Sequence, residues 1–170
     1  MSERIAVYPG SFDPVTFGHL DILDRAAAIF DQVVVGVLEN PGKTPLFTAA
    51  ERVDMLRACL ESRSRIEVTT FDGLTVEFAA GTGAIAIVRG LRVISDFETE
   101  FQMALMNRRL NPAVNTVFLM TSFSNVFISS SLIKEVCRLG GNVSEMAPPV
   151  SVEAMRRRFA EQREQEARTS

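Results

Sequence analysis

The sequence predicts an α/β fold: a Rossmann-like three-layer sandwich with a five-stranded parallel sheet, helices on both faces and an additional C-terminal helix. Three observations lead to this prediction. Five short apolar runs rich in β-branched residues alternate with longer amphipathic segments. The runs are apolar at successive positions, which is typical of strands covered on both faces. Repeated alternation of strand and helix favours parallel strands joined by right-handed crossovers.

The five predicted strands are distinguished by length and composition. Each is apolar at most positions and too short for an ordinary helix. They are Ile5–Tyr8, Val33–Leu38, Ile66–Val68, Ala84–Val88 and Val114–Met120.

The helices between the strands are indicated by capping residues and apolar stripes. Thr48 and Glu51 have the spacing of a capping box, in which each side chain satisfies an amide of the first turn. A helix that ends at Gly140 fits the glycine preference of that position. The predicted helices run from about Gly18 to Phe30, from Thr48, over Val76–Ala80, from Ser95 and from Ser129 to Gly140.

The fourth predicted helix opens with a second capping-box spacing, Ser95 and Glu98. Phe97, Phe101 and Leu105 then follow one another at intervals of four residues. We expect this stripe to be part of the hydrophobic core.

The chain has 170 residues and predicts a single domain. We assign residues 1–150 to the α/β domain. Pro148 and Pro149 mark a break before a last helix, expected from about Val152. Residues 151–170 are predicted to form a charged helix of the same domain, with a tail that frays from Glu164.

Composition excludes several classes of protein. The net charge of −3 disfavours a duplex nucleic acid as the main partner. No apolar run approaches the ~18 residues of a membrane span. Cys59 and Cys137 lack C-x-x-C spacing, so we expect two small core residues in a reducing compartment. The N-terminus has no apolar signal segment. We therefore expect a cytoplasmic protein that partners neither nucleic acid nor membrane.

Candidate site residues follow the predicted strands, where open α/β sheets bind ligands. His19 lies beyond the first strand and Lys43 beyond the second, while Arg89 and Arg92 follow the fourth. Ser129–Ser131 come after the fifth and open a helix. Local positive charge on an acidic protein, together with helix N-termini, predicts an anionic ligand, and phosphate is the natural candidate.

Each residue has a simpler interpretation when taken alone. The single histidine can be a surface or capping residue, Lys43 a solvated turn residue, the two arginines a solvated loop pair and the serines an N-cap cluster. Arg156–Arg158 have acidic neighbours and indicate a solvated helix face rather than a nucleic-acid patch. The simpler interpretations do not explain why every strand end carries residues compatible with phosphate.

Three motifs extend the prediction by resemblance. Gly10–His19 resembles the T-x-G-H form of the H-x-G-H motif of the nucleotidyltransferase superfamily. Arg89–Arg92 with Asp96–Glu98, and Ile128–Lys134, complete a pattern similar to the bacterial phosphopantetheine adenylyltransferase family. The similarity runs from about Ile5 beyond Pro148. It implies transfer of the adenylyl group of ATP to 4′-phosphopantetheine with Mg²⁺, giving dephospho-coenzyme A and pyrophosphate.

The resemblance also implies roles for individual residues. His19 is expected to stabilise the transition state. The residues expected to bind phosphopantetheine are Ser11, Lys43, Thr75 and Arg89. Those expected to bind ATP are Ser11, Phe12, His19, Gly90, Leu91, Arg92, Glu100, Asn125, Val126, Phe127, Ile128, Ser129, Ser130 and Ser131. Mg²⁺ is expected on the ATP phosphates and water, with no protein ligand named.

One departure from the family concerns Asn125 and Val126, where the family often has an aromatic residue and then serine. Side-chain contacts from these positions are therefore not carried over. The family also implies a homohexamer and inhibition by coenzyme A. The alternatives are another nucleotidyltransferase, acting on nicotinate mononucleotide or of the cytidylyl type, and a non-catalytic nucleotide sensor on the same fold.

Overall fold

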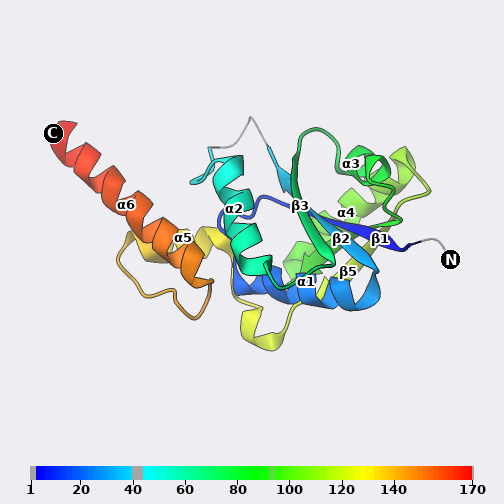
Figure 1. The fold of residues 1–170 in the computed structure, drawn as a ribbon, viewed down its shortest axis with the longest axis horizontal. Coiled ribbons are helices and arrows are strands. Elements are labelled where there is room, and N and C mark those ends of the chain that lie inside the picture. The colour runs from blue at the N-terminus through cyan, green and yellow to red at the C-terminus, as the bar shows by residue number, and fades with distance from the viewer. Residues whose placement is uncertain (1–2, 40–43, 93, 170) are drawn as a thin grey trace.

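The structure is a computed structural model that describes residues 3–39, 44–92 and 94–169, with the backbone alone at 94–96 and 169. Helices and strands follow one another in the predicted order (Figure 1). They are β1 (Ile5–Gly10), α1 (Phe17–Ile29), β2 (Gln32–Leu38), α2 (Ala49–Leu60), β3 (Ile66–Phe71), α3 (Thr75–Gly81), β4 (Ala86–Leu91), α4 (Ile94–Leu110), β5 (Asn115–Met120), the 3-10 turn η1 (Phe123–Asn125), α5 (Ser130–Arg138) and α6 (Pro149–Thr169).

The five strands form one parallel sheet in the order β3-β2-β1-β4-β5, which confirms the predicted fold class. The central strand β1 pairs with β2 on one side and with β4 on the other. The chain builds the sheet outward from β1 to β3 on one side and then crosses back to add β4 and β5 on the other side. The switch point of the sheet therefore lies between β1 and β4. Loops at such a switch point diverge and leave a crevice at the carboxyl ends of the strands.

Both faces of the sheet are covered, as the apolar runs predicted. Along β1, Ala6 and Tyr8 point into one core and Val7 into the other. The larger core includes residues of α1, α2, α5 and α6, and the smaller one includes Val76 and Ala79 of α3. The capping box at Thr48 is confirmed, because Glu51 N donates to Thr48 Oγ1 and Thr48 N donates to Glu51 Oε2.

The sequence predictions for α4 are wrong in two respects. The helix begins at Ile94, so Ser95 lies inside it and is not its N-cap. Phe97, Phe101 and Leu105 are 43%, 45% and 54% exposed and are not core residues. The physical reason is that α4 carries apolar side chains around most of its circumference, whereas α3, β4 and β5 cover only part of it.

The C-terminal helix α6 begins at Pro149, three residues before the predicted start. Proline suits the first helical position because the amide that it lacks has no partner there. Val152, Met155 and Phe159 of α6 pack into the larger core, and the helix extends to Thr169. Within the described part of the chain, no helix is both long and apolar enough to cross a membrane.

Candidate active site

A cavity of about 610 Å³ lies at the carboxyl ends of β1 and β4, at the switch point of the sheet. Its walls come from the loop after β1, the start of α1, α2, the end of β4, α4 and the start of α5. The sequence-predicted site residues that line it are Ser11, Phe12, His19, Arg89, Gly90, Arg92, Glu100, Ile128, Ser129, Ser130 and Ser131. Residues far apart in the sequence are thus brought together around one space.

Five further predicted site residues do not line this cavity. Thr75 is the first residue of α3, and Leu91 ends β4. The other three, Asn125, Val126 and Phe127, belong to the loop between β5 and α5, in which Phe127 is 76% exposed. Lys43 lies outside the described residues.

His19 is fixed by the cap of its own helix. Thr16 is the N-cap of α1, and His19 occupies the position where a capping box usually has glutamate. The His19 amide donates to Thr16 Oγ1 at 3.3 Å, and the Thr16 amide donates to His19 Nδ1 at 3.1 Å. Because Nδ1 accepts a hydrogen bond, the proton of the neutral ring is on Nε2. The T-x-G-H spacing therefore sets both the position and the tautomer of the ring.

The protonation state of His19 follows from its surroundings. Burial and, to a smaller extent, the positive charge of Arg92 lower the pKa of His19 to about 4. At neutral pH the ring is uncharged and remains a hydrogen-bond donor through Nε2. His19 can stabilise negative charge in the cavity, but it does not carry a resident positive charge.

The side chain of Phe12 packs against the His19 ring. Its backbone is in the left-handed region at φ 49° and its side chain is only 2% exposed. The ring meets His19 edge-on at 5.0 Å between centroids and Tyr8 at 5.4 Å. A Cβ at Gly10 would come within 3.0 Å of the Phe12 ring. The Phe12 side chain is therefore part of the packing around His19 and Tyr8. If Phe12 contacts a ligand, it does so through its backbone.

Arg89 and Glu100 form a bidentate ion pair in the cavity wall. Arg89 Nε donates to Glu100 Oε2 at 2.6 Å and Nη2 donates to Oε1 at 2.5 Å. A third donor, Nη1, reaches Pro9 O at the end of β1. The two residues carry opposite charges, so the positive charge of Arg89 is already compensated by the protein.

The loop after β5 is attached to α1 through a residue that the sequence analysis did not single out. Asp21 accepts hydrogen bonds from Thr121 Oγ1 at 3.2 Å and from Ser122 N at 2.6 Å. Farther along this loop, Asn125 Nδ2 donates to Ser122 Oγ at 2.8 Å. The Asn125 side chain therefore stabilises its own loop.

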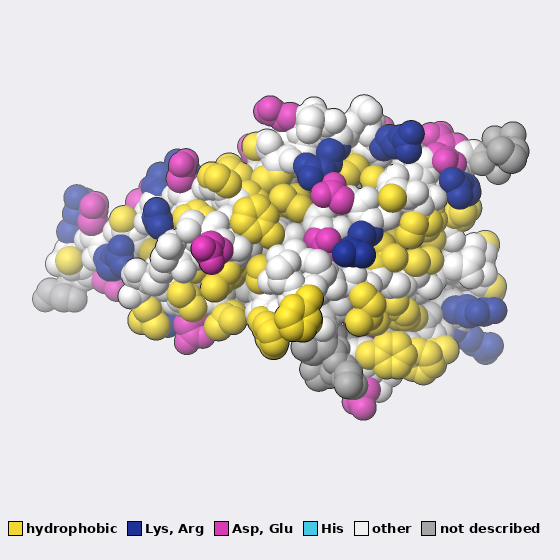
Figure 2. Space-filling model, turned by 90° about the horizontal axis from the view of Figure 1, so that it is seen from below, with side chains coloured by type: hydrophobic (Ala, Val, Ile, Leu, Met, Phe, Trp, Pro, Cys, Tyr) yellow, Lys and Arg dark blue, Asp and Glu magenta, His cyan; other side chains and the backbone are white. Residues whose placement is uncertain are grey.

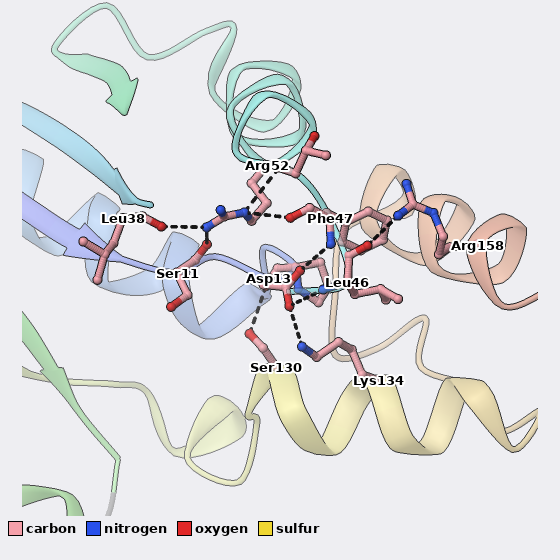
Figure 3. Close-up of polar contacts among 11 residues, drawn as sticks. Ser11, Asp13, Leu38, Leu46, Phe47, Arg52, Ser130, Lys134 and Arg158 are labelled. Atoms are coloured by element: carbon pink, nitrogen blue, oxygen red, sulfur yellow. Dashed lines mark hydrogen bonds and ion pairs between the residues drawn. The ribbon is translucent and has the colours of Figure 1, made fainter. Parts of the chain in front are cut away.

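Asp13 and Lys134 are further residues of the cavity wall that were not predicted (Figure 3). The buried Asp13 carboxylate accepts from Leu46 N, Phe47 N and Lys134 Nζ, the last at 2.5 Å. The pair joins the loop after β1 to α5 and to the segment before α2. Both residues lie inside the motifs quoted from the sequence, but their mutual contact spans 121 positions and no local pattern reveals it.

Arg52 on α2 is the third unpredicted charged residue in the wall. It is 4% exposed and donates to the backbone carbonyls of Ser11, Leu38 and Phe47 (Figure 3). The sequence does contain a signal for Arg52. A cation in the first turns of a helix is disfavoured by the helix dipole, so its presence there indicates a specific role.

Metal-binding side chains do not gather in the described residues. No group of three or more His, Cys, Asp or Glu side chains there could hold an ion. The carboxylates of the cavity, Asp13 and Glu100, are both engaged in ion pairs.

The fold and the site define a class of protein. A parallel sheet with a cavity at its switch point, a neutral histidine donor at a helix start and a serine-rich helix N-terminus suit a nucleotidyltransferase. Residues 7–136 match the family described as cytidylyltransferase-like.

Relatives narrow the class further. The chain is 51% identical over 156 residues to a phosphopantetheine adenylyltransferase of Caldanaerobacter subterraneus, covering 92% of this chain and 98% of the relative. It is 54% identical to that of Heliobacterium modesticaldum, over 92% of this chain and 94% of the relative. The protein of that name from Geobacter sulfurreducens is 52% identical over 94% and 98% of the two chains. This chain belongs to the phosphopantetheine adenylyltransferase family.

Proposed function

We propose that this protein transfers the adenylyl group of ATP to 4′-phosphopantetheine, giving dephospho-coenzyme A and pyrophosphate in coenzyme A biosynthesis. The observation that carries the proposal is the placement of His19: a neutral donor, fixed by its helix cap, in a cavity that arginine, lysine and serine side chains also line. The relatives at about 50% identity, named phosphopantetheine adenylyltransferase, supply the acceptor.

The reaction needs no general base on the protein. The acceptor's phosphate monoester is already anionic at neutral pH, so one of its oxygens can attack the α-phosphorus of ATP directly. The bond from the α-phosphorus to the bridging oxygen breaks, and that oxygen leaves with its electron pair as part of pyrophosphate. Catalysis then consists of aligning two anions and stabilising the charge that builds up around the α-phosphate.

His19 supplies that stabilisation in our account. Its Nε2–H donates to phosphate oxygens, and because Nδ1 is held by Thr16 the ring does not have to reorient when charge develops. A neutral donor also avoids binding the ground-state anions as strongly as a cation would. A larger part of its hydrogen-bond energy therefore stabilises the transition state relative to the bound substrates.

We assign the predicted site residues to the two substrates, and call the two groups the acceptor side and the ATP side. On the acceptor side we place Ser11, Lys43, Thr75 and Arg89. On the ATP side we place Gly90, Leu91, Arg92 and the segment 125–131, with the amides and hydroxyls at the start of α5 meeting phosphate. Ser130 Oγ donates to Pro14 O, which ties the start of α5 to the loop that precedes His19.

For Glu100 we propose a role in addition to the one implied by resemblance. Its carboxylate is occupied by Arg89 at 2.5 Å and 2.6 Å. We therefore propose that Glu100 orients Arg89 for the acceptor's phosphate, and that any contact it makes with ATP is secondary.

Mg²⁺ would arrive with ATP. It keeps much of its water shell and is commonly held through substrate phosphates, so the engaged carboxylates of the cavity suit an ion that the nucleotide brings. When bound, it would neutralise charge on the phosphates.

We further propose that the protein is a cytoplasmic homo-oligomer, a hexamer by analogy with the family. Apolar side chains gather in groups on the surface seen in Figure 2. On α4, Phe97, Phe101, Met103, Leu105, Met106 and Leu110 are all 43% to 57% exposed. Exposed apolar surface of this extent favours burial against another copy of the chain.

Coenzyme A is expected to inhibit the enzyme by occupying the same cavity. It carries both the pantetheine arm and the adenylyl group that the two substrates contribute separately, so competition with both substrates is the expected pattern.

The test of the proposed function is pyrophosphate release by the purified protein with ATP and Mg²⁺. We expect release with 4′-phosphopantetheine and none with nicotinate mononucleotide or without acceptor. Turnover with nicotinate mononucleotide would assign the protein to another nucleotidyltransferase activity. ATP binding with no turnover for either acceptor would support the nucleotide sensor.

A further inference from the structure

The charges in the cavity wall are unevenly compensated. Among the residues that the structure describes, four arginine or lysine side chains and two carboxylates line it. Glu100 is paired with Arg89, and Asp13 is paired with Lys134. Among the described residues, Arg52 adds a positive charge to this wall without such a carboxylate partner.

Arg52 holds its charge in an unusual environment. The side chain is 4% exposed, and within the described residues no carboxylate forms an ion pair with it. It also lies in the fourth position of α2, where the helix dipole disfavours a cation. A buried cation is costly unless it is hydrogen-bonded, so its hydrogen bonds must account for its presence.

The hydrogen bonds of Arg52 run to backbone carbonyls of three separate segments (Figure 3). Nη1 donates to Ser11 O at 2.6 Å, in the loop after β1, and to Leu38 O at 3.1 Å, at the end of β2. Nε donates to Phe47 O at 3.1 Å and to Thr48 O at 3.3 Å, at the start of α2. One guanidinium therefore fixes these three segments relative to one another.

We propose that Arg52 is a positioning residue for the acceptor's phosphate. It sets the backbone of Ser11 at the cavity, and its uncompensated charge attracts the phosphate monoester to the same side. This inference rests on the proposed function, and it adds a residue that the family resemblance does not supply.

The location of the carbonyls assigns Arg52 to the acceptor rather than to ATP. Arg52 Nη1 donates to Ser11 O, and Ser11 is one of the residues that we place on the acceptor side. On the ATP side, Arg92 donates to Ile128 O at 3.1 Å, close to the start of α5. Arg52 and Arg92 therefore contact different segments of the cavity wall.

The chemistry of arginine separates the two parts of this role. Its planar fork presents five donors in fixed directions, whereas lysine has a single point charge on a flexible stem. Arg52→Lys keeps the charge and loses the fixed hydrogen bonds. Arg52→Gln loses both the charge and the full set of bonds. Comparing the two variants distinguishes attraction from positioning.

The experiment measures kcat, KM for each substrate and the melting temperature of both variants, at low and high ionic strength. Arg57→Gln is the matched control: it removes the same charge from the same helix, at an exposed position that donates to Val68 O. For Arg52→Lys we expect kcat to fall about 10- to 100-fold with KM near the wild-type value, because displaced groups cost about that much.

For Arg52→Gln we expect, in addition, a roughly tenfold or larger rise in KM for 4′-phosphopantetheine at low ionic strength, with a smaller effect at high salt. The KM for ATP should change less, and Arg57→Gln should match the wild type. If both Arg52 variants keep the wild-type KM values, and their activity falls only in proportion to folded protein, Arg52 is a structural residue and the inference is wrong.

If Arg52→Gln does not fold, the Arg52→Lys variant alone tests the inference. A kcat of Arg52→Lys equal to that of the wild type would then overturn it. Failure of the wild-type protein to use 4′-phosphopantetheine would instead refute the proposed function, so the two failures are distinguishable.

Discussion

Replacing His19 with alanine is the perturbation that bears most directly on the mechanism. The structure places a neutral Nε2–H donor in the cavity, with Nδ1 held at 3.1 Å from the Thr16 amide. Removing one preorganised donor to a developing oxyanion costs about 10²- to 10³-fold in kcat, or about 2.7–4 kcal/mol of transition-state stabilisation. The affinity for ATP should fall far less, since the neutral ring contributes little to binding the ground state.

The assay combines steady-state pyrophosphate release with calorimetric measurement of ATP affinity on the same preparations. Thr16→Val is a companion variant, because it removes the hydroxyl but leaves the Thr16 amide that fixes Nδ1. We expect it to lose about 1 kcal/mol of stability as an N-cap variant and to keep more of kcat than His19→Ala.

An equal loss in ATP affinity and in kcat/KM for His19→Ala would refute this reasoning. It would show that His19 contributes uniform binding rather than stabilisation of the transition state.

Three further predictions concern pH, folding and assembly. The pKa of His19 is about 4 in the fold against 6.5 in the unfolded chain, so the unfolded chain binds the proton more tightly and stability is lost as pH falls between these values. From pH 7 to pH 5 the loss is about 2 kcal/mol in urea unfolding, and a His19→Ala protein showing the same loss would contradict the assignment. Lys134→Met leaves the Asp13 carboxylate without its ion pair, and we expect about 3–5 kcal/mol of destabilisation, partly recovered by adding Asp13→Asn; no recovery would mean that the two residues do not act as a pair. Phe101→Glu on the exposed face of α4 should lower the oligomer mass measured by light scattering, and an unchanged mass would exclude this face as an interface.

The fold was predictable because its signal is local. Strands apolar on both faces and helices that begin at capping residues alternate along the chain, and these patterns do not depend on distant residues. The prediction that the apolar stripe of α4 is part of the core is wrong. Periodicity shows that a helix has an apolar side, but it does not show how much of that side the neighbouring elements cover. Phe97 and Phe101 remain 43% and 45% exposed for that reason.

The candidate site was predictable where its residues follow strand ends. His19, Arg89, Arg92 and Ser129 came together because parallel strands end at one edge of the sheet. The position of Arg52 near a helix start is visible in the sequence, but its partners are not, because they are backbone carbonyls as many as 41 positions away and every residue has such a carbonyl. Its meaning arises only when the fold brings Ser11 and Leu38 together.

Adenylyl transfer to 4′-phosphopantetheine is tested most directly by identifying the product. The protein would be given ATP, Mg²⁺ and an equimolar mixture of 4′-phosphopantetheine and nicotinate mononucleotide, and the products analysed by mass spectrometry. We predict that dephospho-coenzyme A and pyrophosphate form together while nicotinate mononucleotide is unchanged. Adenylylation of nicotinate mononucleotide, or consumption of ATP without any adenylylated acceptor, would contradict the account.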